Sequence, residues 1–295
     1  MSFASFQNDT RERLEQHLQA LLRNSTSTRL AEAMRYSLLD GGKRLRPLLV
    51  RAAADSMGVS TNQWLYPAAA LEMMHVYSLI HDDLPAMDDD DLRRGKATNH
   101  RAFDEATAIL AGDALQSLAY EHLSQTPELG CNARLSMIRL LAEKAGHAGM
   151  VGGQMLDLQA EGRQLGLDEL EAIHRLKTGA LIEAALHLGA FCTNTDLPEA
   201  TLDTLTTYGQ ALGLAFQITD DILDVTIDTA TLGKPQGSDA ALNKATYVQL
   251  LGLGGARHEA QMQIDAAHQA LDRLGGVAPE ASLRQLATYV LTRDH

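Results

Sequence analysis

The sequence predicts an all-α protein, and three observations carry this prediction. Alanine and leucine dominate the composition, aromatic residues make up only 4%, and the 295 residues include 7 prolines, which favours helices over sheet. Apolar residues recur at the three- and four-residue spacing of amphipathic helices. No segment shows the alternation typical of a strand. We therefore expect a single all-α domain over residues 1–295, built as a helical bundle.

The first half of the chain predicts a series of helices that begin and end at recognisable residues. Ser27 or Thr28 is a candidate N-cap, and Gly41-Gly42 should end the helix that follows. Pro47 suits the first turn of the next helix. Further on, the small residues 111–114 would permit close packing between helices. The expected helices are residues 9–23, 28–39, from 47 onward, 65–83 and 104–123.

The second half continues the same pattern. Residues 133–149 should be helical and lead into a glycine-rich passage, residues 149–153. Asp168 is the expected cap of a helix that reaches residues 175–179. Residues 226–243 have weak periodicity and are interpreted as a mobile loop or lid. The other expected helices are residues 201–225, one starting at residue 244, and residues 280–292.

Composition and charge exclude several classes of function. The formal net charge is −13, which argues against a nucleic-acid partner because phosphate binding needs a positive surface. Cys131 and Cys192 are too few for a disulfide framework and fit a reducing cytoplasm. The first residues have neither a basic nor a long apolar stretch, so we expect no signal peptide and no stable membrane insertion.

An acidic stretch follows the helix expected at residues 65–83. Six carboxylates fall within residues 82–91, and Arg93-Arg94 come directly after them. A run of like charge is most often a solvated segment. Here an apolar helix precedes it, and Pro85 should break that helix and turn Asp88 back towards Asp82. Such oxygen ligands suit Mg²⁺, and the arginines suit a phosphate.

A second acidic group lies in the helix expected at residues 201–225. Asp220 and Asp224 are one turn apart and lie on one face, and apolar neighbours indicate a largely buried helix. Buried carboxylates need a counter-charge. Two such groups facing each other would form a cage for several metal ions and a diphosphate.

Cations form a third pattern. Lys43, Arg44 and Arg46 follow the glycine turn at residues 41–42, either as a basic loop that balances the acidic groups or as a diphosphate cradle. The spacing is not that of a Walker A loop. Lys177-Thr178 would ordinarily be interpreted as solvent-facing. His75 taken alone is more often a core or surface residue than a ligand.

These motifs together resemble the short-chain trans-isoprenyl diphosphate synthases, and among them the bacterial farnesyl diphosphate synthases. The resemblance covers nearly the whole chain. It is carried by DDxxxxD at residues 82–88 followed by two arginines, and by DDxxD at residues 220–224 preceded by Phe216-Gln217. The supporting pieces occur in the expected order at residues 42–47, 153–158, 177–178 and 233–234.

The resemblance implies an all-α fold around a deep central cavity, a homodimer, and Mg²⁺ as cofactor, with three ions when diphosphate is bound. It implies condensation of isopentenyl diphosphate with dimethylallyl and geranyl diphosphate through an allylic carbocation. The metal motifs would be Asp82, Asp83, Asp88, Asp220, Asp221 and Asp224. The allylic diphosphate would be held by Arg93, Lys177 and Lys234, with Thr178 and Gln217 beside it. Isopentenyl diphosphate would be bound by Lys43, Arg46, His75 and Arg94.

The resemblance also bears on product length and on closure of the site. In this family the residues four and five positions before the first aspartate face the growing chain, and here they are Ser78 and Tyr77. The bulky tyrosine should stop growth near fifteen carbons, unless it is merely a core residue. Many relatives end in a basic tail that folds over the isopentenyl site, whereas this chain retains only Arg293.

Other functions remain as alternatives. A geranyl or geranylgeranyl diphosphate synthase would differ only in its product. A terpene cyclase shares the first motif but usually has a different second one. A helical metal-dependent phosphohydrolase could use His81-Asp82, with His75 and Asp220 as further ligands, but it leaves Arg93-Arg94 unexplained. An acidic calcium-binding or scaffold protein would bind metal without turnover.

Overall fold

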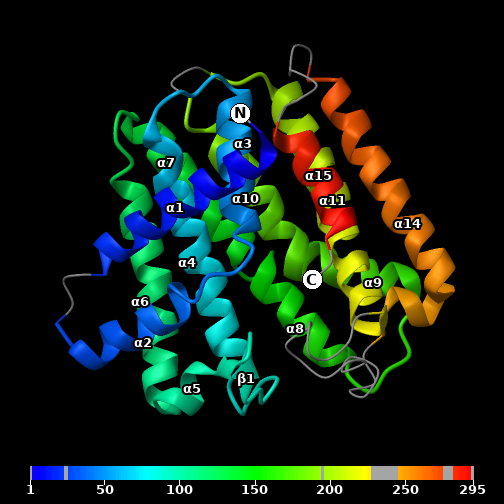
Figure 1. Ribbon diagram of the computed structural model, residues 1–295, viewed down its shortest axis with the longest axis horizontal. Coiled ribbons are helices and arrows are strands. Elements are labelled where there is room, and N and C mark those ends of the chain that lie inside the picture. Colours follow the sequence, from blue (N-terminus) through cyan, green and yellow to red (C-terminus); the bar gives the residue numbers. More distant parts are fainter. Residues whose placement is uncertain (1, 23–25, 194–195, 227–244, 275–281, 294–295) are drawn as a thin grey trace. The chain divides into compact units, whose positions relative to one another are not determined.

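The computed structural model describes residues 2–22, 26–193, 196–226, 245–274 and 282–293. Helices make up nearly all of the regular structure of these residues, as Figure 1 shows, and the predicted all-α class is confirmed. The chain divides into two compact units, Met1–Arg139 with Leu188–Asn194, and Leu140–His187 with Thr195–His295. The boundary falls within the helices α7 (Cys131–Ala145) and α10 (Ala180–Ala190). The single domain and its central cavity therefore stay predictions.

The first unit contains most of the helices expected for the first half of the chain. Its other elements are α1 (Phe3–Leu21), α2 (Thr28–Leu38), α3 (Leu45–Ser56), η1 (Asn62–Trp64), α4 (Leu65–Asp82), β1 (Leu92–Arg93), β2 (Lys96–Ala97), α5 (Asn99–Ala102) and α6 (Glu105–Ser124). Ser27 caps α2 by accepting a hydrogen bond from Leu30 N at 3.3 Å. The first helix begins at Phe3 rather than residue 9, because the Ser2 hydroxyl caps it.

Helices α4 and α6 pack closely where the sequence places small residues. A Cβ atom at Gly112 would lie 2.1 Å from His81 Nε2. The same imidazole nitrogen lies 3.1 Å from the carbonyl oxygen of Ile109. The glycine therefore makes room for a histidine next to the first aspartate motif, and the expectation of close packing at residues 111–114 is confirmed.

The hairpin β1–β2 is a feature that periodicity did not predict. Its strands are two residues long and pair Leu92 with Ala97 and Arg93 with Lys96. The connecting residues Arg94 and Gly95 have φ values of 53° and 78°, as in the two-residue turns that suit the twist of a hairpin. Strands this short carry no alternation. The turn places Arg93 and Arg94 at the end of a small, defined element.

The second unit is also helical. Its other elements are α8 (Met150–Ala160), α9 (Leu167–His174), the π-helical turn η2 (Arg175–Gly179), α11 (Glu199–Thr226), α14 (Tyr247–Asp272) and α15 (Ser282–Thr292). The prediction that Asp168 caps α9 is wrong. The cap is Gly166, whose N–H donates to the Glu169 carboxylate at 3.1 Å, while Asp168 lies within the first turn.

The glycine-rich passage at residues 149–153 is largely part of α8 and not a separate loop. A Cβ atom at Gly153 would lie 2.3 Å from the backbone nitrogen of Lys177 in η2. The glycine is therefore required for α8 to pack against η2. Gly213 of α11 similarly faces Gly179, with its hypothetical Cβ 3.0 Å from the Gly179 Cα.

A hydrophobic core within the second unit fixes the helix that carries the second aspartate motif. The core joins α9, α11 and α14. Its fully buried members include Ile218 of α11 and Tyr247 of α14. Because Ile218 and Ile222 lie in this core, the apolar face of α11 holds the helix in place beside the aspartates.

Candidate active site

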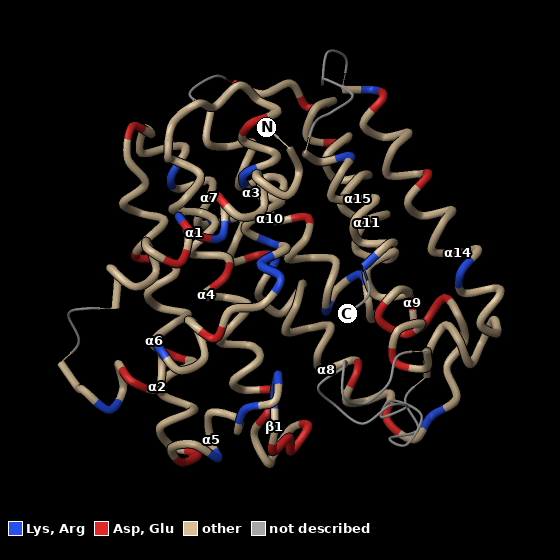
Figure 2. Tube along the Cα trace, in the orientation of Figure 1, with Lys and Arg blue, Asp and Glu red and all other residues tan. Residues whose placement is uncertain are grey.

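The first aspartate motif lies where α4 ends and the chain turns. Asp82 is the last residue of α4, and the N–H of Asp88 donates to the carbonyl oxygen of Asp82 at 2.9 Å. Asp88 therefore returns to the end of the helix, and the predicted turn is confirmed. Both residues are half-buried. Figure 2 shows the acidic residues of this stretch gathered beside β1.

Asp83 points away from solvent and pairs with Arg93 of β1. The guanidinium donates through Nε at 2.8 and 3.0 Å and through Nη2 at 2.6 Å, which is a bidentate pair. Only 4% of the Asp83 side chain is exposed. Burial raises the pKa of the Asp83 carboxyl, and Arg93 opposes part of that shift. Asp83 thus fixes the hairpin to the end of α4.

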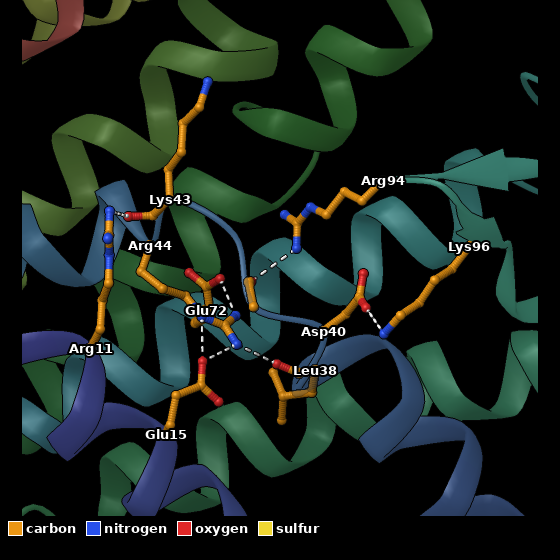
Figure 3. A network of polar contacts seen from close by, with 10 residues as sticks. Arg11, Glu15, Leu38, Asp40, Lys43, Arg44, Glu72, Arg94 and Lys96 are labelled. Atoms are coloured by element: carbon orange, nitrogen blue, oxygen red, sulfur yellow. Dashed lines mark hydrogen bonds and ion pairs between the residues drawn. The ribbon is translucent and has the colours of Figure 1, made fainter. Parts of the chain in front are cut away.

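The basic turn, residues 41–46, is organised by Arg44 at its centre. Arg44 is the N-cap of α3 and has left-handed backbone angles, φ 51° and ψ 37°. Its buried guanidinium donates to Glu72 at 2.6 Å, to Glu15 at 2.5 Å and to the carbonyl oxygen of Leu38 at 2.7 Å. Such a backbone conformation persists only where the surroundings hold it. Figure 3 shows the Lys43 side chain extending away from this network.

Arg94 and His75 belong to the same basic group in the first unit. Arg94 Nη1 donates to the carbonyl oxygen of Gly41 at 2.9 Å. A Cβ atom at Gly42 would lie 2.7 Å from that guanidinium nitrogen, so the second glycine of the turn makes room for it. Burial lowers the pKa of His75 well below its usual value, and Arg46, Arg94, Arg93 and Arg44 lower it further. His75 is therefore a neutral hydrogen-bonding group near neutral pH.

Two further contacts fasten the hairpin to the C-terminal end of α2. Lys96 forms an ion pair with Asp40, and the Tyr36 hydroxyl donates to the carbonyl oxygen of Ala97 at 2.7 Å. Figure 3 shows Asp40, Lys96 and Arg94 converging on the basic turn. The turn and the hairpin, which carry four of the predicted phosphate-binding cations, are thereby joined within one unit.

The second aspartate motif lies on the last turns of α11. Asp221 and Asp224 are buried, whereas 39% of the Asp220 side chain is exposed. Asp221 accepts hydrogen bonds from the backbone nitrogen of Tyr247 at 2.8 Å and from Gln217 Nε2 at 3.3 Å. The three carboxylates therefore have different environments, although the sequence presents them as equivalent.

Lys177 and Thr178 lie in η2, and they are joined to neighbouring motifs. Lys177 Nζ donates to Asp157 of α8 at 2.6 Å, and the Thr178 hydroxyl donates to Gln217 Oε1 at 3.3 Å. Both side chains are part-buried. The pair therefore does not simply face solvent, as two such residues within a helix ordinarily would. A π-helical turn re-aims the side chains at that point and is frequent at functional sites.

The C-terminal arginine contacts the second aspartate motif. Arg293 Nη2 donates to Asp220 Oδ1 at 2.5 Å and to the carbonyl oxygen of Phe216 at 3.0 Å. Its guanidinium carbon lies 4.0 Å from the centre of the Phe216 ring. The structure therefore pairs Arg293 with an aspartate of its own unit.

Other predicted features lie outside these two groups. Lys234 and residues 227–243 of the expected lid lie outside the described residues. The first motif belongs to one unit and the second to the other, so their facing each other stays a prediction. Among the described side chains, no three from His, Cys, Asp and Glu are already grouped as a metal site. Tyr77 is buried and Ser78 half-buried on α4.

Sequence reasoning missed the residues that support the site. Glu15, Glu72, Tyr36 and Asp40 hold the basic turn and the hairpin, yet none belongs to a recognised motif. Glu72 carried a signal, because it is the only charged residue in the apolar run of residues 65–74. Glu15 carried none, since it lies on an ordinary charged stretch, and Asp40 is a single aspartate before the glycine turn.

Comparison with known proteins decides the family. Residues 27–274 match the family model described as polyprenyl synthetase. The chain belongs to the polyprenyl synthetase family. It is 55% identical to the farnesyl diphosphate synthase of Escherichia coli (strain K12), over 91% of this chain and 90% of that one. It is 43% identical to the farnesyl diphosphate synthase of Geobacillus stearothermophilus, over 100% of this chain and 99% of that one.

Solved structures agree with this membership. A geranyltransferase from Legionella pneumophila superposes with a TM-score of 0.86 at 36% identity, covering 99% of this chain and 97% of that one. The predicted fold of the family is thereby confirmed. Among the described residues, none of the helices combines the length and the hydrophobicity that a membrane-spanning segment requires.

Proposed function

We propose that this chain is a farnesyl diphosphate synthase, which condenses isopentenyl diphosphate with dimethylallyl and geranyl diphosphate. One observation carries the proposal from the site itself. A turn returns Asp88 to Asp82 at the end of α4, directly before a hairpin that presents Arg93 and Arg94. A metal-bound diphosphate needs carboxylates that hold the metal and cations that hold the phosphate oxygens, and this segment carries both side by side. The similarity to farnesyl diphosphate synthases supports the same activity.

The chemistry of the aspartates suits Mg²⁺. Mg²⁺ prefers oxygen ligands and takes one or two carboxylates together with substrate phosphates. Asp82, Asp88 and Asp220, the more accessible members of the two motifs, would hold the ions directly. Asp83, Asp221 and Asp224 would orient them. Three bound Mg²⁺ ions would neutralise the charge that develops on the departing diphosphate.

Two groups of cations would hold the two substrate diphosphates. Lys43, Arg46 and Arg94, with the neutral imidazole of His75, would bind isopentenyl diphosphate. Arg93, Lys177 and Lys234 would bind the allylic diphosphate, with Thr178 and Gln217 beside it. In support, Arg44 and the hairpin contacts hold the first group in place, and η2 with Asp157 holds Lys177.

These residues would bind and orient the substrates while the reaction proceeds without a protein nucleophile. Loss of diphosphate would leave an allylic carbocation, which the double bond of isopentenyl diphosphate attacks. The proton then leaves, and the released diphosphate can accept it. Orientation of the two substrates contributes much of the acceleration in reactions of this kind.

Tyr77 would set the product length at fifteen carbons. It lies on α4 five residues before Asp82, and 5% of it is exposed. Replacing Tyr77 by Ala should give longer products, because the side chain would no longer limit the growing chain. The control is Tyr77→Phe, which keeps the ring. An unchanged product spectrum in Tyr77→Ala would exclude this role.

We further propose a homodimer that works in the cytoplasm. On α6, the apolar residues Ile109 and Leu110 are 44% and 57% exposed to solvent. Such exposed apolar residues suit a contact with a second copy of the chain. Cys131 and Cys192 are free thiols, as in a reducing compartment. Light scattering after size-exclusion chromatography tests the dimer, since a monomeric mass would contradict it.

The activity is tested by incubating the protein with labelled isopentenyl diphosphate, Mg²⁺ and either dimethylallyl or geranyl diphosphate. Chromatography of the dephosphorylated products should give mainly a C15 alcohol. A C10 or C20 product would keep the reaction and exclude the proposed product length. Phosphate release from either diphosphate alone, without elongation, would replace the proposal with a phosphohydrolase.

A further inference from the structure

Arg293, which follows α15, is buried against the second aspartate motif. Only 2% of its side chain is exposed, although it follows the last turn of α15. The contacts already described tie it to Asp220, to the Phe216 carbonyl and to the Phe216 ring. A guanidinium is costly to bury and is found buried where it is paired. Its position is therefore determined by Asp220 and Phe216.

The burial of Arg293 is incompletely compensated. Its Nε and Nη1 atoms are buried and have no hydrogen-bond partner among the described residues. A buried N–H group without a partner loses its hydration and gains nothing in exchange. The Coulombic attraction of a buried ion pair barely repays desolvation even with good partners. The Arg293–Asp220 pair is thus a contact that a stronger competitor for Asp220 can displace.

The carboxylate that Arg293 contacts is the accessible one. Asp221 and Asp224 are each 3% exposed, and Asp221 is bonded to Tyr247 and Gln217. The Asp220 side chain is 39% exposed. A divalent cation arriving from solvent therefore meets Asp220 first, and there it meets the positive charge of Arg293.

We propose that Arg293 is a built-in counter-ion that competes with the divalent metal for Asp220. It neutralises Asp220 when no metal is bound, and metal binding to Asp220 releases it. The C-terminal end of α15 would then report whether the second motif is loaded. This inference rests on the proposed metal-binding role of Asp220, and it adds that the protein lowers its own metal affinity there.

The first test measures metal affinity directly, by calorimetric titration of the purified protein with MgCl₂, alone and with inorganic pyrophosphate. Arg293→Gln should bind Mg²⁺ about fivefold more tightly than the parent, because the competing charge is gone; this corresponds to about 1 kcal/mol. The matched control is Arg284→Gln on α15, which removes the same charge from an ion pair with exposed Asp272. It should change the affinity less than twofold.

Two results of this titration would overturn the proposal. One is an Arg293→Gln affinity equal to or weaker than that of the parent. The other is an equal gain in Arg284→Gln, which would show a general effect of net charge. Arg293→Lys keeps the charge without the forked geometry and should fall between the parent and Arg293→Gln.

A second test needs no variant, because trypsin cleaves after arginine. Arg293 is buried, so intact-mass spectrometry should detect slow removal of the last two residues, and Mg²⁺ with pyrophosphate should accelerate it several-fold. No acceleration would overturn the proposed release. A protein that shows the Mg²⁺ response but forms no prenyl product would contradict the proposed function alone. Product formation without the Mg²⁺ response would contradict the counter-ion alone.

Discussion

The two aspartate motifs differ in which carboxylate is paired with an arginine. In the first motif Arg93 pairs with Asp83, which is buried, and the pair fixes the hairpin to α4. In the second motif Arg293 pairs with Asp220, which is the accessible carboxylate. An arginine on a buried aspartate supports the site, whereas an arginine on an accessible one competes with its ligands. The same pairing thus has opposite consequences in the two units.

The two motifs also differ in how they are held. The first is a turn after the end of a helix, and it depends on backbone hydrogen bonds and on the hairpin. The second lies within α11, which packs closely against η2 at Gly213 and against α14 through the hydrophobic core. We therefore expect substitutions at charges to affect the first motif most, and substitutions at packing positions to affect the second.

The largest effect should come from Asp82→Asn, which removes an accessible carboxylate from the first motif. We expect kcat to fall by about 10³-fold or more, because stabilisation of the developing charge is usually the largest catalytic contribution. The measurement is steady-state condensation at saturating Mg²⁺. Asp89→Asn is the matched control, since it removes the same charge from the same stretch and can keep the positive φ of Asp89. An equal loss in both would show that only the total charge matters.

The next effect concerns the packing that supports the second motif. Gly153→Ala would bring a methyl group to within 2.3 Å of the Lys177 nitrogen, and we expect a loss of about 1–3 kcal/mol of unfolding free energy. Activity should fall with it, because Lys177 and Thr178 move. Urea denaturation measures the stability. Gly254→Ala is the control, since nothing lies within 4 Å of that position, and a similar loss there would contradict the packing argument.

A smaller effect should distinguish an aspartate that supports the site, Asp83, from one that binds metal, Asp220. Asp83→Asn leaves the part-buried Arg93 with only the more distant and more exposed Asp90, at 3.8 Å, as a charged partner, and we expect about 1–2 kcal/mol less unfolding free energy. The Mg²⁺ concentration for half-maximal activity should change little. For Asp220→Asn we expect a clear rise in the Mg²⁺ requirement in addition to a loss of stability, because the buried Arg293 loses its charged partner. Thermal melting and Mg²⁺ titration of both variants decide between these outcomes.

The sequence predicted the helices and the motifs well, because both are local patterns. Pro85 ends α4 and the Ser27 hydroxyl caps α2 through interactions within a few residues. It did not predict η2, since a π-helical turn has the composition of an ordinary helix. Nor did it predict the Arg44–Glu15–Glu72 network or the Arg293–Asp220 pair, because these partners come from elements far apart in the chain. The aspartates of the second motif look equivalent in the sequence but differ in burial, because burial also depends on elements that are far apart in the chain.

The smallest effect should come from Glu72→Gln, which weakens the network beneath the basic turn. Burial disfavours the charged guanidinium, but Glu72 and Glu15 raise the pKa of Arg44, and Glu15 remains in this variant. We expect the KM for isopentenyl diphosphate to rise about three- to tenfold, near 1 kcal/mol, because Lys43 and Arg46 flank the left-handed Arg44. The KM for geranyl diphosphate should change less than twofold. Glu12→Gln, an exposed carboxylate on α1, is the control. If both KM values rose together, the network would support the whole site and not the basic turn in particular.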